Sequence, residues 1–372
     1  MKPFPFVHVS GEDPETLCQQ ALEGLGTVPR HGALGFAYAS DTLADHLGTI
    51  IHCLRAETGI AHWVGTVGMG VCSTGREVYE EPSLAVMVTD VGEEALCIIP
   101  STSADFGEFL ATTASWRTTS DARFAVVHGD PSNPQTPRLI EDLARGLDEG
   151  FLVGGLTSSN SIQAQAADTV VQGGLSGVLL GAGVPVVTGL SQGCSLIGHP
   201  HEITETDRHV IHSLDGRPAL DVFKEDIGEV LARNLEGVGG YIFAALPIPG
   251  SDTGDYLVRN LLGIDPELKL IAVGDHLHAG MTVQFARRDA DTAREDLVRM
   301  VRTVLKRAPG PPKGALYHSC LGRGRYLFGE DSAELRLVAE ELGDLPLVGF
   351  YANGEISHHR LYGYTGVLTL FC

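Results

Sequence analysis

The sequence predicts an α/β fold, with α+β as the alternative, in which four β-α-β-β units form mixed sheets and pair into two domains. Short apolar runs of strand length alternate with segments of helical periodicity, and the order recurs along the chain. The second strand of each unit contains a Val-Gly pair, and such self-similarity is stronger evidence for architecture than a single motif. The pairs are Val64-Gly65, Val153-Gly154, Val273-Gly274 and Val348-Gly349. Because Val-Gly is a common dipeptide, four ordinary α/β units remain the alternative.

Each unit is predicted as a strand, a helix and two further strands. The segments of the first two units are strands at 33–39, 62–70 and 83–89 with a helix at 43–54, then strands at 124–128, 151–156 and 177–180 with a helix at 137–147. The segments of the last two are strands at 241–245, 270–274 and 281–285 with a helix at 256–262, then strands at 315–320, 347–352 and 366–371 with a helix at 332–342.

The remaining segments suggest where the domains divide. Residues 1–31 form a lead-in with one short helix at 14–25. An insert between units two and three carries alternating strands, an Asp215-Gly216 turn and a helix that opens at Pro218. We therefore expect a first domain at 32–216 and a second at 217–372.

Composition excludes several classes of protein. The chain has 372 residues, 43% hydrophobic and 20% charged, which is ordinary for a soluble globular protein. Its formal charge of −21 repels phosphate backbones and anionic lipid, so we expect neither nucleic acid nor membrane partners. No run approaches the ~20 apolar residues of a membrane-spanning helix.

The seven cysteines are odd in number and form no CxxC pair, which predicts reduced thiols in a cytoplasmic protein. The N-terminus lacks the apolar core of a signal peptide, in agreement with a cytoplasmic location.

Two strand ends near the C-terminus carry the residues best suited to bind a ligand. The strands at 315–320 and 347–352 both break into glycines and polar side chains, and such turns bring backbone N–H groups close to a small molecule. The predicted ligand-binding residues are Ser319, Cys320, Gly322, Arg323, Gly349, Asn353, Glu355 and, from the matching strand end of the second unit, Asn160.

Three passages together resemble the FIST family, the "F-box and intracellular signal transduction" sensory domain. They are Gln192-Gly193-Cys194, the run from Leu214 to Leu220, and Cys320-Leu321-Gly322-Arg323-Gly324 followed by Pro346 to Phe350, Asn353-Gly354-Glu355 and Tyr364-Thr365-Gly366. The resemblance covers the chain from about residue 30 onward. It implies a FIST N-domain at 32–216 and a FIST C-domain at 217–372.

The resemblance also implies a function: an intracellular sensor of small ligands, with amino acids or related metabolites as the candidate ligands. We find no kinase, helix-turn-helix or F-box segment, so a sensor of this kind would act on a signalling partner in trans. The expected function is thus a cytoplasmic ligand-sensing protein rather than an enzyme.

Arg323 and Glu355 suggest how an amino acid would be held. Arg323 can pair with a ligand carboxylate and Glu355 with its ammonium group. The alternative is that the two side chains pair with each other as a structural bridge. Asn353 can add an amide contact, or serve only as a turn residue with positive φ.

Cys320 supports an alternative enzymatic function. If Arg323 lies near the thiol, its pKa falls and a Cys320-dependent hydrolase or transferase becomes possible, with His318 as a candidate base. Alternatively, Cys320 is a buried side chain that lines the pocket and does not react. A third reading of the whole protein is a non-catalytic scaffold that binds no ligand.

Cofactors and metals find little support in the sequence. Gly322-Arg323-Gly324 is not followed by the Lys-Ser/Thr of a phosphate-binding loop, and no full dinucleotide fingerprint occurs. The paired histidines do not match zinc-ligand spacing. We therefore expect no cofactor and no metal.

Overall fold

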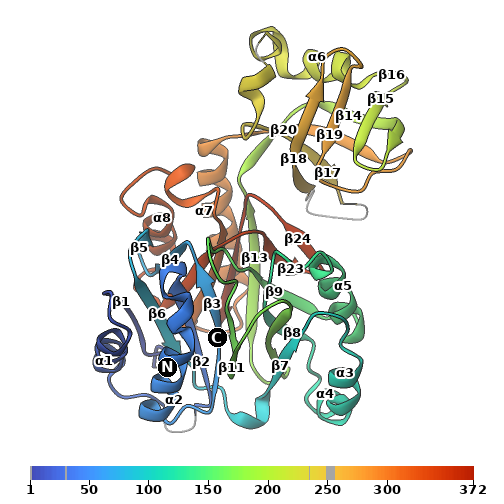
Figure 1. Ribbon diagram of the computed structural model, residues 1–372. Coiled ribbons are helices and arrows are strands. Elements are labelled where there is room, and N and C mark those ends of the chain that lie inside the picture. Colours follow the sequence, from blue (N-terminus) through green and yellow to red (C-terminus); the bar gives the residue numbers. More distant parts are fainter. Residues whose placement is uncertain (1, 30–31, 234, 249–255) are drawn as a thin grey trace. The chain divides into compact units, whose positions relative to one another are not determined.

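The computed structural model describes residues 2–29, 32–233, 235–248 and 256–372 (Figure 1). The chain forms two compact units, one made of Met1–Gln192 with Arg294–Cys372 and the other of Gly193–Ala293. These units do not coincide with the predicted domains at 32–216 and 217–372. The limits of those domains stay a prediction. The predicted class is confirmed: helices combine with mixed sheets.

The first unit contains three sheets, each of six strands. The first sheet has the order β1 (Phe6–Ser10), β6 (Ser83–Val88), β2 (Leu34–Ser40), β3 (His62–Gly68), β10 (Gln165–Ala167), β11 (Thr169–Val171). The second has the order β24 (Arg360–Tyr362), β23 (Glu355–His358), β9 (Phe151–Leu156), β8 (Phe124–Gly129), β12 (Leu175–Leu180), β7 (Leu96–Thr102). The third has the order β13 (Val186–Gln192), β25 (Thr365–Phe371), β21 (Gly314–Cys320), β22 (Leu347–Ala352), β4 (Gly70–Ser73), β5 (Arg76–Tyr79).

Helices connect these strands. They are α1 (Pro14–Leu25), η1 (Asp41–His46), α2 (Leu47–Thr58), η2 (Glu93–Ala95), α3 (Gly107–Thr112), α4 (Ala114–Ser120), α5 (Thr136–Gly146), η4 (Gly324–Tyr326) and α8 (Ala333–Leu342), while α7 (Ala290–Arg307) begins in the second unit and continues into the first. Helix α1 starts at Pro14 because the Asp13 side chain accepts a hydrogen bond from the Thr16 N–H and caps it. This helix has the predicted bounds.

Each sheet of the first unit contains one parallel pair of strands: β2 with β3, β8 with β9, and β21 with β22. A helix lies between the strands of each pair in the chain, since parallel neighbours need a crossover connection. Three of the four predicted Val-Gly pairs lie in these sheets, and a Cβ on Gly65, Gly154 or Gly349 would lie 1.7 to 1.8 Å from a carbonyl oxygen of the neighbouring strand. These shared features agree with the predicted repeat in the first unit, and the repeat itself stays a prediction.

We expect Gly349→Ala to lower the free energy of unfolding by about 1–3 kcal/mol, the usual cost of forcing extra atoms into a packed core. The added methyl group would meet the Tyr317 carbonyl oxygen at 1.7 Å, and backbone cannot move aside cheaply. Gly274→Ala is the control, because the nearest atom to its Cβ is 3.6 Å away. Urea unfolding of both variants checks this, and equal stability would show that the close approach carries no constraint.

The three parallel pairs meet at a buried polar contact. Tyr38 on β2, His128 on β8 and His318 on β21 are fully buried. The Tyr38 hydroxyl lies 3.0 Å from His318 Nε2 and 3.3 Å from His128 Nε2. Burial lowers the pKa of both imidazoles, that of His318 to about 3, so both are neutral at pH 7. The contact joins strands of all three sheets.

The second unit is an antiparallel barrel. Its strands have the order β14 (Cys194–Asp207), β20 (Thr282–Arg288), β17 (Ile242–Pro247), β18 (Tyr256–Asp265), β19 (Leu270–Val273), β15 (Val210–Leu214), β16 (Arg217–Pro218), and its helices are α6 (Ala219–Ala232) and η3 (Leu235–Val238). An additional pairing of β14 with β15 closes the barrel. The predicted turn is confirmed, since Asp215 and Gly216 both have positive φ.

The prediction for the third β-α-β-β unit is wrong. Residues 256–262 lie in strand β18 rather than a helix, because β18 pairs on either side with β17 and β19. Strands β17 and β19 are therefore not neighbours and form no parallel pair like those of the first unit. Local helical periodicity is overridden here by pairing within the barrel.

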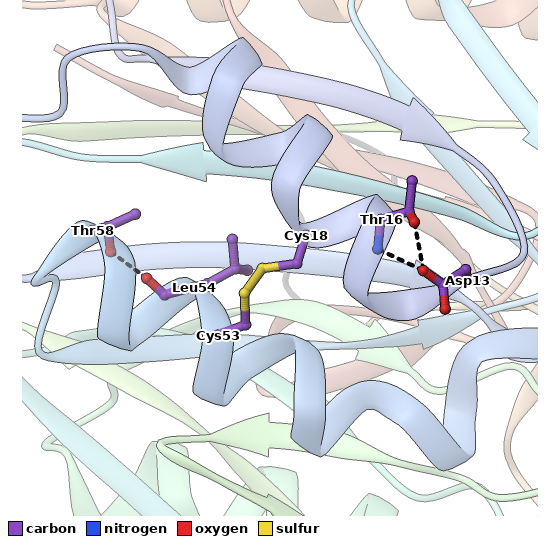
Figure 2. Close-up of a disulfide and its surroundings, with 6 residues drawn as sticks. All are labelled: Asp13, Thr16, Cys18, Cys53, Leu54 and Thr58. Atoms are coloured by element: carbon purple, nitrogen blue, oxygen red, sulfur yellow. Dashed lines mark hydrogen bonds between the residues drawn. A yellow bond between two sulfur atoms is a disulfide. The ribbon is translucent and has the colours of Figure 1, made fainter.

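The prediction that every cysteine is reduced is also wrong. Cys18 on α1 and Cys53 on α2 form a disulfide, because the two helices pack side by side with these Cα atoms 6.6 Å apart (Figure 2). The other five cysteines are free thiols. Helix packing between residues 35 positions apart is not visible in cysteine spacing.

Candidate functional site

The two predicted strand ends lie side by side. β21 and β22 run parallel, with Cys320 opposite Ala352 at their carboxyl ends. After β21 the chain turns into η4, and after β22 it crosses at Asn353-Gly354 into β23 of another sheet, where Glu355 pairs with Gly155. Gly354, with φ 124°, makes this crossing possible. The site is therefore built where two sheets of the first unit meet.

Arg323 is completely buried and makes an internal ion pair. Its Nε donates to Glu334 Oε1 at 2.8 Å, and its Nη2 donates to Ser191 Oγ at 2.9 Å. Burial lowers the pKa of the guanidinium, but Glu334 and Tyr317 more than offset this and hold it above the ordinary value. The Nη1 group has no hydrogen-bond partner among the described residues. One nitrogen of this buried guanidinium therefore donates no hydrogen bond within the described residues.

Glu334, in the first turn of α8, accepts hydrogen bonds from several groups around Arg323. Its carboxylate accepts from the Tyr317 hydroxyl at 2.7 Å, from Ser319 Oγ at 3.0 Å and from the Gly324 N–H at 2.8 Å. A buried charge pair needs such additional hydrogen bonds to offset its desolvation. Glu334 therefore fixes the conformation of the turn that follows β21.

Glu355 is also completely buried, and its two oxygens differ. Oε2 accepts from the Thr365 N–H at 3.0 Å and from Thr365 Oγ1 at 2.8 Å, whereas Oε1 has no partner among the described residues. Burial raises the pKa of this carboxyl to about 8, although the Thr365 bonds and the Arg323 charge act in the opposite direction. Glu355 is consequently mostly protonated at pH 7.

Cys320 does not have the lowered pKa that a nearby arginine predicts. Burial and the Glu355 charge raise the pKa of the thiol, and they outweigh the Gly322 and Tyr364 backbone N–H groups and Arg323, which act the other way. His318 Nε2 lies 3.0 Å from the Tyr38 hydroxyl rather than at the thiol. The thiol is therefore neutral at pH 7, which contradicts the activation expected for a nucleophile.

The structure brings Ser319, Cys320, Arg323 and Glu355 into one polar cluster, which is fully buried except for the partly exposed Cys320. This cluster is linked by the Ser319–Glu334 and Arg323–Glu334 hydrogen bonds and by electrostatic contact of Glu355 with both Cys320 and Arg323. Neither of the predicted arrangements of Arg323 describes its direct contacts, since its partner is Glu334.

The remaining predicted residues take other positions. Gly322 adjoins the cluster, and a Cβ there would meet the Tyr364 ring at 2.9 Å. Gly349 lies in the middle of β22. Asn353 and Asn160 are exposed, and their main-chain N–H groups donate to the Leu156 carbonyl and to Asp41. A direct role for these four residues in ligand binding stays a prediction.

Among the residues that the structure describes, no group of three or more His, Cys, Asp or Glu side chains could hold a metal ion. Within the same described part of the chain, no helix is long and apolar enough to cross a membrane.

Comparison with known proteins identifies the family. The model of the FIST N domain matches residues 33–217 and that of the FIST C domain matches residues 219–358. This chain belongs to the FIST family. FIST domains form a family of sensory domains in signal transduction.

Relatives of this FIST protein occur in mycobacteria. It is 32% identical over 357 residues to the uncharacterized protein Rv0628c of Mycobacterium tuberculosis, with 91% of each chain covered. It is 30% identical over 358 residues to the uncharacterized protein Mb0898c of Mycobacterium bovis, with 91% of this chain and 89% of the relative covered. The similarity therefore extends over both FIST domains.

Sequence reasoning missed the residues that hold the cluster together. They are Glu334, Tyr317, Thr365 and Ser191, from four different elements. One signal could have found Glu334: an arginine between two glycines at a buried strand end needs a carboxylate, and Glu334 opens the helix that follows. The other three are ordinary strand residues in the sequence.

Proposed function

We propose that this FIST protein binds a small zwitterionic metabolite, an amino acid or a close relative, and passes its occupancy to a signalling partner in trans. The observation that carries the proposal is that two polar atoms of the buried cluster make no hydrogen bond within the described residues. Arg323 Nη1 and Glu355 Oε1 are buried, chemically complementary to a carboxylate and an ammonium group, and without partners among the described residues. Groups of this kind are costly to leave unsatisfied, and a zwitterion would satisfy both.

The charges in the cluster suit a ligand that is itself neutral overall. Arg323 is already balanced by Glu334. Glu355, mostly protonated at pH 7, adds no full charge. A free carboxylic acid or a free amine would bring an unbalanced charge into a buried site, whereas a zwitterion brings both signs together. This favours amino acids over simple acids or amines.

Both side chains are completely buried, so a ligand reaches them only in a conformation in which part of their cover has opened. Occupancy would then stabilise one arrangement of the turn at Gly322–Gly324 and of α8. A ligand shifts such an equilibrium only by its difference in affinity for the two conformations. This link between binding and conformation is what a sensor requires.

The enzymatic alternative, a Cys320-dependent hydrolase or transferase, is less well supported because the pKa of the thiol is raised. Selective alkylation of Cys320 at neutral pH would argue for it. The scaffold alternative predicts no stabilisation by any small molecule.

A thermal-shift panel tests the proposal. We expect an amino acid at one hundred times its Kd to stabilise the protein by about 2.7 kcal/mol, while its deaminated and decarboxylated counterparts do so far less. An ammonium group bound at Glu355 would favour the ionised carboxylate, which Glu355→Gln keeps the size of but cannot form, so the shift should shrink. Glu330→Gln is the control, since Glu330 is exposed. If no compound raises the melting temperature, the sensor proposal fails; an undiminished shift in Glu355→Gln would remove Glu355 from the site.

A further inference from the structure

A disulfide ties the N-terminal segment to the body of the first unit. Cys18 on α1 is joined to Cys53 on α2 across 35 positions of sequence (Figure 2). Helix α1 lies before residue 33, where the match to the FIST N domain begins, and α2 lies within that match. The bond therefore attaches a segment outside the family domain to a helix inside it.

We propose that the Cys18–Cys53 disulfide is a redox-sensitive latch that keeps β1 and α1 docked, and that its state regulates the buried Arg323–Glu355 site. The regulatory part rests on the function proposed above.

The docked segment covers one edge of the first unit. β1 is an edge strand of its sheet and, among the described residues, pairs with β6 alone, from Phe6 opposite Met87 to Ser10 opposite Ser83. All five residues of β1 are only partly buried. The buried face of α1 is small, and its buried residues are Leu17, Cys18, Ala21 and Leu25. The covalent bond adds to the strand pairing and to this buried face in holding the segment in place.

The two cysteines of the bond differ in exposure. Cys18 is 1% exposed, while Cys53 is only partly buried. An external thiolate would attack Cys53 Sγ, form a mixed disulfide there, and release Cys18 as a thiolate that takes up a proton. A second external thiolate would then displace Cys53 from the mixed disulfide. The net change is one protein disulfide reduced to two thiols and two external thiols oxidised to one disulfide.

A chain of contacts leads from β1 toward the site. His8 Nδ1 lies 2.8 Å from Ser73 Oγ, and Arg76 donates to the His8 carbonyl at 3.1 Å and to Ser10 Oγ at 2.9 Å. Ser73 and Arg76 belong to the β4–β5 hairpin. Movement of β1 would therefore disturb this hairpin first.

The same hairpin holds the start of α8. Glu77 on β5 donates its N–H to Ser332 Oγ at 2.9 Å, and its carboxylate accepts from the Leu335 N–H at 3.1 Å. Glu334, between these two contacts, is the ion-pair partner of Arg323. Undocking of β1 would thus loosen the carboxylate on which the Arg323 conformation depends, through contiguous packed contacts.

Hydrogen exchange with mass spectrometry on the intact protein tests the latch. Disulfides typically stabilise by an amount equal to roughly 30- to 1000-fold in an equilibrium constant, so reduction should speed exchange of residues 6–25 by a factor in that range. Cys18→Ser with Cys53→Ser should behave like the reduced protein under oxidising conditions. Cys97→Ser is the control, because Cys97 is a partly buried free thiol outside the latch.

The same experiment separates the latch from the ligand. Peptides covering 324–335 should also exchange faster on reduction, whether or not a ligand is present. Unchanged exchange at 6–25, once the mass confirms reduction, would overturn the latch. Faster exchange at 6–25 without any change at 324–335 would overturn regulation of the site. Failure of the amino-acid panel would overturn the proposed ligand and leave both exchange results standing.

Discussion

Replacing Glu334 by glutamine is expected to lower the free energy of unfolding by about 3–5 kcal/mol, the usual cost of leaving one partner of a buried ion pair uncompensated. Arg323 stays charged and is fully buried, so its charge would lose its direct carboxylate partner. Glutamine keeps the size of the side chain, which separates the loss of charge from the loss of packing. Urea unfolding measures the difference.

Glu340→Gln is the matched control, because Glu340 lies on the same helix and is exposed. Such a change should cost within about 0.5 kcal/mol. Adding Arg323→Met to Glu334→Gln should recover part of the loss, since it removes the unbalanced charge. If Glu334→Gln is no more harmful than Glu340→Gln, the ion pair does not hold the turn after β21.

Mild acid is expected to destabilise the protein through its two fully buried histidines, His128 and His318. The unfolded chain binds these protons near pH 6.5, while the folded chain does not bind them until far lower pH, about 3 for His318. The unfolded state therefore holds more protons below pH 6.5, and its free energy falls relative to the folded state. Each histidine contributes up to about 1.36 kcal/mol per pH unit, or roughly 4 kcal/mol for the pair at pH 5.

Glu355 acts in the opposite direction over the same range. Its folded pKa of about 8 lies above the ordinary value of 4.5, so its contribution to stability is full below pH 4.5 and is lost as the pH rises toward 8. Between pH 6.5 and 5 it offsets up to about 2 kcal/mol of the histidine effect. The net loss expected for the unaltered protein is therefore about 2 kcal/mol from these three groups.

Urea unfolding at pH 7.5, 6.5, 5.5 and 5.0 checks this balance. Glu355→Gln should make stability fall more steeply with acid, because the opposing group is gone. His318→Leu should reduce the slope of stability against pH by up to about 1.36 kcal/mol per pH unit, the contribution of one proton. This holds whatever the effect of the substitution on stability at pH 7.5. Parallel profiles for all three proteins would contradict the assignment of these groups as the buried titrating residues.

The family and the coarse architecture follow from local sequence. Asp13 and Pro14 set the start of α1 within a few residues, and the glycines of the Val-Gly pairs mark the second strand of each parallel pair in the first unit. Three passages taken together, at 192–194, at 214–220 and from Cys320 onward, indicate the FIST family. In the barrel, by contrast, a helical pattern at 256–262 was a poor guide, because the neighbouring strands β17 and β19 decide the conformation of β18.

The sequence by itself determined which side chains gather at the two strand ends, because parallel strands place their carboxyl ends at one edge. Only the tertiary structure decided what those side chains contact. Glu334 pairs with Arg323, Thr365 holds Glu355, and Cys18 meets Cys53, since each of these contacts depends on how separate elements pack. Burial, which no local pattern measures, then sets the protonation of Glu355, Cys320 and the two histidines, and with it the chemistry of the site.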